Sequence, residues 1–146
     1  MNEHTKVFNY KIASKKKRFY AFMLELFFSL IVIFALNYLF YQEDLDTFLN
    51  ADTNLYSILL NAVAAFGIGA ACYPLFSGNI GHRILNIKVI DAKTGNDFNN
   101  FFEGGIREFV KNFLSNFILP VIWLFFDKKH QNAYDKVTNT YVVERK

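Results

Sequence analysis

A single carboxylate interrupts the first long apolar stretch of the chain. Glu25 lies about two helical turns beyond the basic run at residues 15–18. An unpaired charge in hydrocarbon costs several kcal/mol, so this carboxylate must be protonated, paired or exposed to water. Two kinds of chemistry fit these conditions. One is a proton or cation site, and the other is a structural ion pair that holds two helices together.

The partner of Glu25 must come from one of several basic residues. Arg18 precedes it by seven positions, about 10 Å along a helix, so a direct bond would require both side chains to bend. Arg107 or Lys111, on a helix packed over this end, would reach more easily, and Arg83 is a further candidate. We favour the structural ion pair, with Arg107 as partner, because two helices enclose no pathway of their own and a carrier would have to oligomerise.

Other reactive residues are sparse. His4, His82 and His130 are isolated, and the single cysteine, Cys72, excludes an internal disulfide and a cysteine-based zinc site. Ser29, Ser57 and Ser115 have no histidine nearby, and no nucleophile–base set is visible. We therefore expect no enzymatic activity, no metal and no cofactor. Asp135 is interpreted as a helix cap or an ion-pair partner of a basic residue.

Two segments are long and apolar enough to position these residues in a membrane. They are residues 19–41 and residues 55–76, each about 22 residues long, and the second carries no charge. A helix of that length crosses the ~30 Å hydrocarbon core. Hydrophobic residues make up 53% of the 146 residues, which leaves too little polar surface for a protein of this size in water. We predict two transmembrane helices.

The second segment carries small residues at a spacing of four. Ala65 is followed by Gly69, and Gly67 by Ala71. Small side chains at this spacing allow another helix to approach closely, which is how helices pack in lipid. The neighbour is either the first helix of the same chain or a helix of a partner chain, and we favour the first.

A third apolar region, about residues 101–126, has a different pattern. Its first part alternates charged and apolar faces at helical spacing, which predicts an amphipathic helix in the headgroup region. Only residues 117–126 lack polar side chains, about half the length needed to cross, and Pro120 interrupts them. We expect this segment to lie at the membrane surface or dip into it.

Charge and strand patterns set the expected topology. Basic residues gather before the first span, after the second and at the end of the chain, whereas residues 42–54 carry four acidic residues and no basic one. By the positive-inside rule both termini are cytoplasmic, in a bacterial inner membrane. Segments 86–91 and 140–145 alternate like strands and are expected to pair on the cytoplasmic side.

The predicted fold class is therefore an all-α membrane protein. It has two transmembrane helices, an interfacial amphipathic helix and a small cytoplasmic β-ribbon. We divide the chain into a basic cytoplasmic segment, a membrane domain and a basic tail, at residues 1–18, 19–143 and 144–146.

Four blocks of sequence then point to a family. They are R-F-Y-A-F-M-L-E with Arg18, Ala21 and Glu25, S-G-N-I-G-H-R-I-L-N-I-K-V with Gly81, Arg83 and Val89, the isolated Arg107, and A-Y-D-K-V-T-N-T-Y-V-V with Asp135, Thr140, Val142 and Val143. In these blocks the sequence resembles the RDD family of small membrane proteins, named for one arginine and two aspartates. Glu25 stands where the family has aspartate, and Tyr134 replaces the usual histidine. Ser77, Asn79, His82 and Asn86 also depart from the family pattern.

The resemblance implies a fold with two membrane helices and a suspected role in transport. Our leading hypothesis is a transport-associated or accessory component of a membrane complex. One alternative is an oligomeric ion or small-solute carrier that uses Glu25 as a proton or cation site. Another is a lipid-interacting modulator that uses the basic helix at 103–118. The expected partners are the lipid bilayer and another membrane protein or a second copy. Nucleic acid is not expected, because basic residues flank apolar segments instead of forming a stripe.

Overall fold

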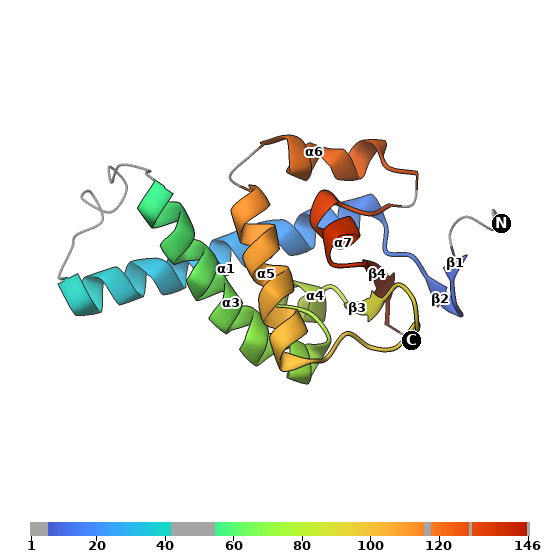
Figure 1. The fold of residues 1–146 in the computed structure, drawn as a ribbon, viewed down its shortest axis with the longest axis horizontal. Coiled ribbons are helices and arrows are strands. Elements are labelled where there is room, and N and C mark those ends of the chain that lie inside the picture. The colour runs from blue at the N-terminus through green and yellow to red at the C-terminus, as the bar shows by residue number, and fades with distance from the viewer. Residues whose placement is uncertain (1–5, 42–54, 116–117, 129, 146) are drawn as a thin grey trace.

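The computed structural model is mostly helical and describes residues 6–41, 55–115, 118–128 and 130–145. Its elements, in chain order, are β1 (Lys6–Val7), β2 (Tyr10–Lys11), α1 (Lys15–Tyr41), α3 (Leu55–Phe76), α4 (Ile80–Ile84), β3 (Ile87–Asp91), α5 (Phe101–Ser115), α6 (Ile118–Phe126), α7 (Ala133–Val137) and β4 (Thr140–Glu144). Figure 1 shows α3 and α5 side by side, with the long α1 crossing them and the strands gathered at one end.

Helices α1 and α3 contain the two predicted spans. Among the described residues, one stretch is long and apolar enough to cross a membrane, Asn61–Ile84, with a mean hydropathy of 1.3. It covers most of α3 and runs into α4. The end of α1 and the start of α3 lie at the same end of the molecule, opposite the strands (Figure 1). The crossing by α1 stays a prediction, and the predicted acidic loop at 42–54 falls outside the described residues.

Helix α3 packs along α5 through glycines on both helices. A Cβ atom added to Gly69 would lie 2.6 Å from the carbonyl oxygen of Gly104, and one added to Gly105 would lie 2.6 Å from the ring of Phe66. No side chain larger than hydrogen fits these contacts without a shift of the helices. The interpretation that Gly69 packs against the first helix is therefore wrong, because α5 of the same chain occupies that place.

The remaining small residues of α3 lie elsewhere. Gly67 and Ala71 are exposed, and a Cβ atom added to Gly67 would meet nothing within 4 Å. Ala65 and Ala71 line a cavity that faces α1. The four residues of the predicted packing face thus serve at least two different surfaces.

These two environments give a direct test. We expect Gly69→Leu to lower the stability of the protein by about 1–3 kcal/mol or more, because the added side chain overlaps the backbone of α5. Gly67→Leu, the same substitution two positions away, should change it by less than about 0.5 kcal/mol. Thermal unfolding in detergent micelles measures both. Equal tolerance of the two changes would contradict the close α3–α5 contact.

Helix α5 turns its charged side inward. Arg107, Glu108 and Lys111 are only 0%, 4% and 5% exposed, whereas Phe101 and Phe102 are both 60% exposed. The prediction of an amphipathic helix with its charged face toward the headgroups is therefore wrong. The reason is that α1, α3 and α7 supply polar partners for this face, while apolar side chains are the ones suited to contact lipid.

The segment predicted as one element over 101–126 forms two helices. Helix α5 ends at Ser115 and α6 begins at Ile118. Pro120 lies in the first turn of α6, where the N–H that proline lacks has no partner within the helix. In Figure 1, α6 lies beyond the end of α5 and runs at a steep angle to it.

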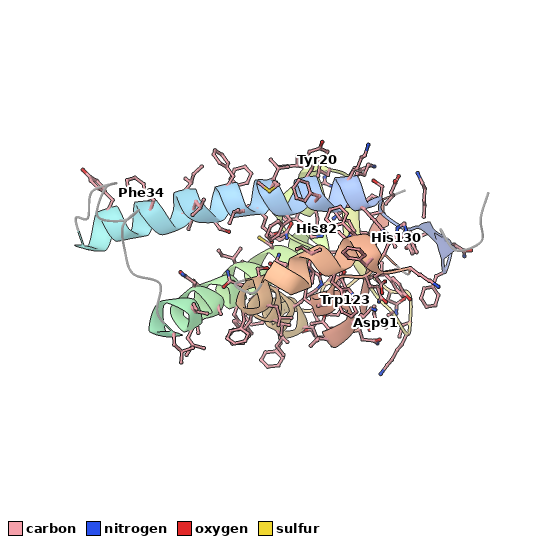
Figure 2. The ribbon with its side chains drawn as sticks, turned by 90° about the horizontal axis from the view of Figure 1, so that it is seen from above. Tyr20, Phe34, His82, Asp91, Trp123 and His130 are labelled. Atoms are coloured by element: carbon pink, nitrogen blue, oxygen red, sulfur yellow. The ribbon has the colours of Figure 1, made fainter. Side chains whose placement is uncertain are left out.

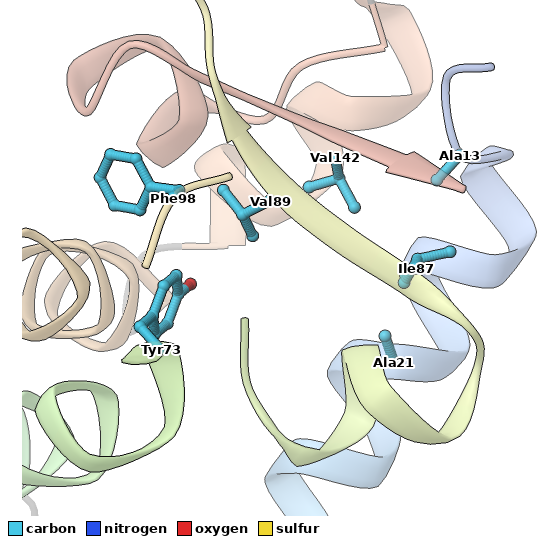
Figure 3. Packing of buried hydrophobic residues seen from close by; sticks show 7 residues of the cluster. All are labelled: Ala13, Ala21, Tyr73, Ile87, Val89, Phe98 and Val142. Carbon is cyan, nitrogen blue, oxygen red and sulfur yellow. The ribbon is translucent and has the colours of Figure 1, made fainter. Parts of the chain in front are cut away.

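Strands β3 and β4 pair antiparallel from Ile87 opposite Glu144 to Asp91 opposite Thr140. These are the two segments whose alternation predicts a ribbon, and its side of the membrane stays a prediction. Ile12 adds a bridge to Val143, so the segment before α1 extends the ribbon. The apolar face of the ribbon packs onto the start of α1 and the end of α3 in one core (Figure 3), made of Ala13, Ala21, Tyr73, Ile87, Val89, Phe98 and Val142.

Candidate functional site

Three elements that are distant in sequence bring two arginines to one aspartate. Arg18 lies in the first turn of α1, Arg107 in α5 and Asp135 in the first turn of α7. All three are buried. We call these three residues the arginine–aspartate triad.

Asp135 uses both carboxylate oxygens. Oδ1 accepts a hydrogen bond from Nη2 of Arg107 at 2.5 Å, and Oδ2 accepts one from Nη2 of Arg18. Oδ2 also accepts the backbone N–H of Asn132 at 2.8 Å, which forms one half of a capping box at the start of α7. Asp135 therefore acts both as a helix cap and as an ion-pair partner. Arg18 also donates to the carbonyl oxygen of His130, so α1 is tied to the segment before α7.

The protonation of Asp135 reflects this setting. Burial by itself raises the pKa of a carboxyl group, but the charges of Arg18 and Arg107 and the hydrogen bond from Asn132 outweigh it. The pKa of Asp135 is therefore lowered from its ordinary value. The triad holds a carboxylate that stays ionised at neutral pH.

Tyr73 connects the triad to a second set of charges. Nη1 of Arg107 donates to the Tyr73 hydroxyl oxygen at 2.5 Å, and that hydroxyl donates to Oε1 of Glu108 at 2.8 Å. The same Nη1 lies 3.5 Å from Oε1 of Glu108. Arg107 and Glu108 are neighbours in α5, yet both are held by one tyrosine of α3.

The second set of charges surrounds Lys111. Its ammonium group forms ion pairs with Glu25 of α1 and with Glu108, three positions earlier in α5. Glu25 also accepts a hydrogen bond from Nδ2 of Asn79. The Oδ1 of Asn79 accepts the backbone N–H of His82 at 2.9 Å and so caps α4. We call Glu25, Glu108, Lys111 and Asn79 the Glu25 cluster.

The Glu25 cluster borders a cavity of about 350 Å³ between α1, α3, α4 and α5. Apolar residues of α1 and α3 form most of its wall. The polar groups of the cluster converge at one part of this wall, and Asn112 and Ser115 add further polar atoms. Ligand sites are commonly mostly apolar cavities of this size with a few converging polar groups.

The two groups of charges balance each other. Two arginines and one aspartate give the triad an excess of one positive charge, and two glutamates and one lysine give the Glu25 cluster an excess of one negative charge. Tyr73 and the Arg107–Glu108 contact join them. Buried charges are tolerated when they are paired and hydrogen-bonded, and this network meets both conditions.

The structure corrects the expected partner of Glu25. Arg107, the favoured candidate, is held by Asp135 and Tyr73, and Arg18 is also turned toward Asp135. Arg83 is exposed. Lys111 is the ion-pair partner of Glu25, because it lies one helical turn beyond Arg107 on the buried face of α5.

Sequence reasoning missed Tyr73, Asn79 and Glu108 as members of the network. Glu108 had a signal, because it precedes Lys111 by three positions on the charged face of α5. That face was assigned to the headgroups and not to the interior. Tyr73 carried no signal, since a tyrosine in an apolar helix has many roles. Asn79 became relevant only when α4 placed it beside α1.

A close contact explains two further residues of the family blocks. A Cβ atom added to Gly81 in α4 would overlap the backbone of Ala21 in α1. Gly81 and Ala21 therefore allow α4 to approach α1, which puts Asn79 within reach of Glu25. The segment around Gly81 forms the short helix α4.

Comparison with known proteins supplies the family. The family model described as RDD family matches residues 12–139, most of the chain. The chain belongs to the RDD family. No curated protein and no solved structure gave a match. Family membership and the apolar stretch in α3 and α4 together indicate a small membrane protein.

In this RDD protein residues from all four family blocks meet in one network. Arg18 and Glu25 come from the first block, Asn79 from the second, Arg107 from the third and Asp135 from the fourth. Arg83, from the second block, is exposed and lies outside the network. Over the described part of the chain, no group of three or more His, Cys, Asp or Glu side chains is placed to hold a metal ion.

Proposed function

We propose that the protein is a two-span component of the bacterial inner membrane with both termini and the β-ribbon on the cytoplasmic side. The supporting observations are the basic residues around the start of α1 and in the C-terminal segments, and the position of the described chain ends. Strands β1 and β4, which are near the two ends of the described chain, lie at the end of the molecule away from the ends of α1 and α3 that flank 42–54 (Figure 1).

Single-cysteine labelling tests this topology. With Cys72→Ala as background, a cysteine at Asp46 should react with a membrane-impermeant maleimide added to intact spheroplasts. A cysteine at Lys93, in the exposed turn after β3, should react only after the membrane is opened. Labelling of both positions from outside would contradict two spans with cytoplasmic termini.

We further propose a transport-associated role in which Glu25 is the site that responds to a proton or small cation. The observation that carries this proposal is that the Glu25–Lys111 ion pair borders a cavity and is not sealed within the core. The side chain of Glu25 is 17% exposed, whereas Asp135 in the triad is fully buried. The proposal includes no catalytic step.

Binding of a proton or cation at Glu25 would weaken a contact between two helices. A proton or cation that reaches Glu25 from the cavity competes with Lys111 for the carboxylate. Because this pair joins α1 to α5, binding weakens the link between the two helices. The triad stays intact, since Asp135 lies outside the cavity wall. Occupancy of Glu25 would thus alter how α1 packs against α5, while the triad continues to join α1, α5 and α7.

Flux measurements test the role of Glu25. In proteoliposomes with a pH-sensitive or cation-sensitive dye inside, Glu25→Gln is expected to abolish protein-dependent flux, because the amide keeps the shape but cannot titrate. Glu103→Gln is the matched control, since Glu103 is an exposed glutamate at the start of α5. Wild-type flux in the Glu25→Gln protein would defeat the proposal, as would an absence of any flux with the wild-type protein.

The second candidate is an accessory subunit that binds a larger membrane complex. It is favoured by the exposed Gly67 on α3, where an added Cβ atom would meet nothing within 4 Å and another helix could approach closely. In that case Gly67→Leu should leave the isolated protein stable but remove the proteins that co-purify in mild detergent. The third hypothesis, a lipid-interacting modulator, relied on a basic α5 surface, and the burial of Arg107 and Lys111 removes that basis.

A further inference from the structure

A second cavity shares no lining residue with the cavity beside the Glu25 cluster. It measures about 690 Å³ and is bordered by α6, α7 and the ribbon. Its wall includes the aromatic rings of Trp123, Phe126 and Tyr141 and the two ammonium groups of Lys128 and Lys136. None of these residues takes part in the triad or the Glu25 cluster.

The charge of this cavity favours an anion. Asp127 is the acidic residue in its wall, and its carboxylate accepts hydrogen bonds from Nζ of Lys136 and from the backbone N–H of Gln131 at 3.0 Å. Two lysines against one aspartate leave an excess of one positive charge. Lys136 also stands 5.1 Å above the Trp123 ring, which holds its ammonium at the aromatic edge of the cavity.

The apolar side of the same cavity is open. Trp123 and Phe126, in the last turn of α6, are 49% and 81% exposed. In a membrane protein, tryptophan and neighbouring lysines mark the level of the lipid headgroups. Figure 2 shows Trp123 in the half of the molecule that holds the start of α1 and His130.

Contacts between α6 and α1 also place the end of α6 at the level of the lipid headgroups. Nζ of Lys15 donates to the carbonyl oxygen of Phe125 at 2.7 Å, and the rings of Phe19 and Phe125 lie 6.4 Å apart. Residues 15–19 are where the basic run meets the first apolar segment, which is the predicted water boundary of α1. The end of α6, and with it the cavity, lies at the same depth.

We infer that the cavity between α6, α7 and the ribbon binds the headgroup of an acidic phospholipid. Lys128 and Lys136 contact the phosphate, Tyr141 and Asn139 offer polar contacts to the headgroup, and the acyl chains run along the exposed rings of α6. Basic pockets on the cytoplasmic side of membrane proteins bind anionic headgroups in this manner. The inference does not depend on the role of Glu25.

The chain offers a direct probe, because Trp123 is its only tryptophan. The full-length protein is reconstituted in phosphatidylcholine vesicles that contain equal mole fractions of either brominated phosphatidylglycerol or brominated phosphatidylcholine. We expect the brominated acidic lipid to quench Trp123 fluorescence more strongly, and the difference to shrink at high salt. Equal quenching by the two lipids would overturn the inference.

Two lysine variants test whether the preference for the acidic lipid arises at this cavity. Lys128→Gln should weaken the apparent association with the acidic lipid about fivefold, since a lysine near the headgroups contributes that much. Lys16→Gln removes the same charge from an exposed position in the first turn of α1, outside the cavity, and should leave the association unchanged. Equal losses in both variants would mean a general surface attraction and not a site. Full reversal of the quenching difference by soluble glycerol phosphate would mean an anion site that does not require lipid.

Discussion

Asp135→Asn is expected to destabilise the protein by about 3–5 kcal/mol. The variant keeps the shape of the side chain but leaves Arg18 and Arg107 buried without a carboxylate. Removal of one partner from a buried ion pair costs this much because the remaining charge is uncompensated. Thermal or denaturant unfolding of the purified protein in detergent measures the change.

A half-exposed aspartate provides the control. Asp97 forms an ion pair with Lys88, and its side chain is 41% exposed. We expect Asp97→Asn to cost less than about 1 kcal/mol, since water screens such pairs. If Asp135→Asn were as mild as Asp97→Asn, the triad would not be the element that holds α1, α5 and α7 together.

The same carboxylate predicts a dependence on pH. The pKa of Asp135 is lower in the folded protein than its ordinary value of 3.8. Its contribution to stability is therefore fully present above about pH 4 and is lost as the pH falls through the folded pKa. The stability of the wild-type protein should decline on acidification below pH 4 more steeply than that of Asp135→Asn. Parallel acid curves for the two proteins would show that Asp135 titrates alike in both states.

The elements of this fold could be predicted from the sequence where local patterns decide them. The long apolar run of 55–76 coincides with α3, and the alternation in 86–91 and 140–145 corresponds to the paired strands β3 and β4. Both patterns depend only on which side chains within the segment are apolar, so they can be read without knowing the neighbouring elements. The position of each element relative to the others required the structure.

The environment of α5 shows why the candidate site was only partly predictable. The helical spacing of its charged and apolar residues is plain in the sequence, but that spacing fits two opposite orientations. In water or at headgroups the charged face points outward. Here it points inward, because Asp135, Tyr73 and Glu25 arrive from three other helices. Which partner each charge takes follows from that arrangement, so Arg107 and Lys111 could not be told apart as the partner of Glu25.

The Glu25–Lys111 pair should show strong coupling in a double-mutant cycle. Lys111→Met is expected to cost about 3–5 kcal/mol, because it leaves Glu25 and Glu108 facing each other without the ammonium. Glu25→Gln should cost less, since Lys111 keeps Glu108 as a partner. The double variant should recover part of the loss, with a coupling free energy of about 1–3 kcal/mol measured by unfolding in detergent.

Double-mutant cycles that combine Glu25→Gln with changes at other basic residues test whether the coupling is specific to Lys111. Glu25→Gln and Arg83→Gln should add within about 0.5 kcal/mol, because Arg83 is exposed and lies outside the network. Glu25→Gln with Arg107→Gln should show a smaller coupling than the Lys111 cycle, since Arg107 reaches Glu25 only through Glu108. A larger coupling with Arg107 than with Lys111 would contradict the pairing in the structure. It would mean that Arg107 leaves Asp135 to pair with Glu25, as the sequence alone led us to expect.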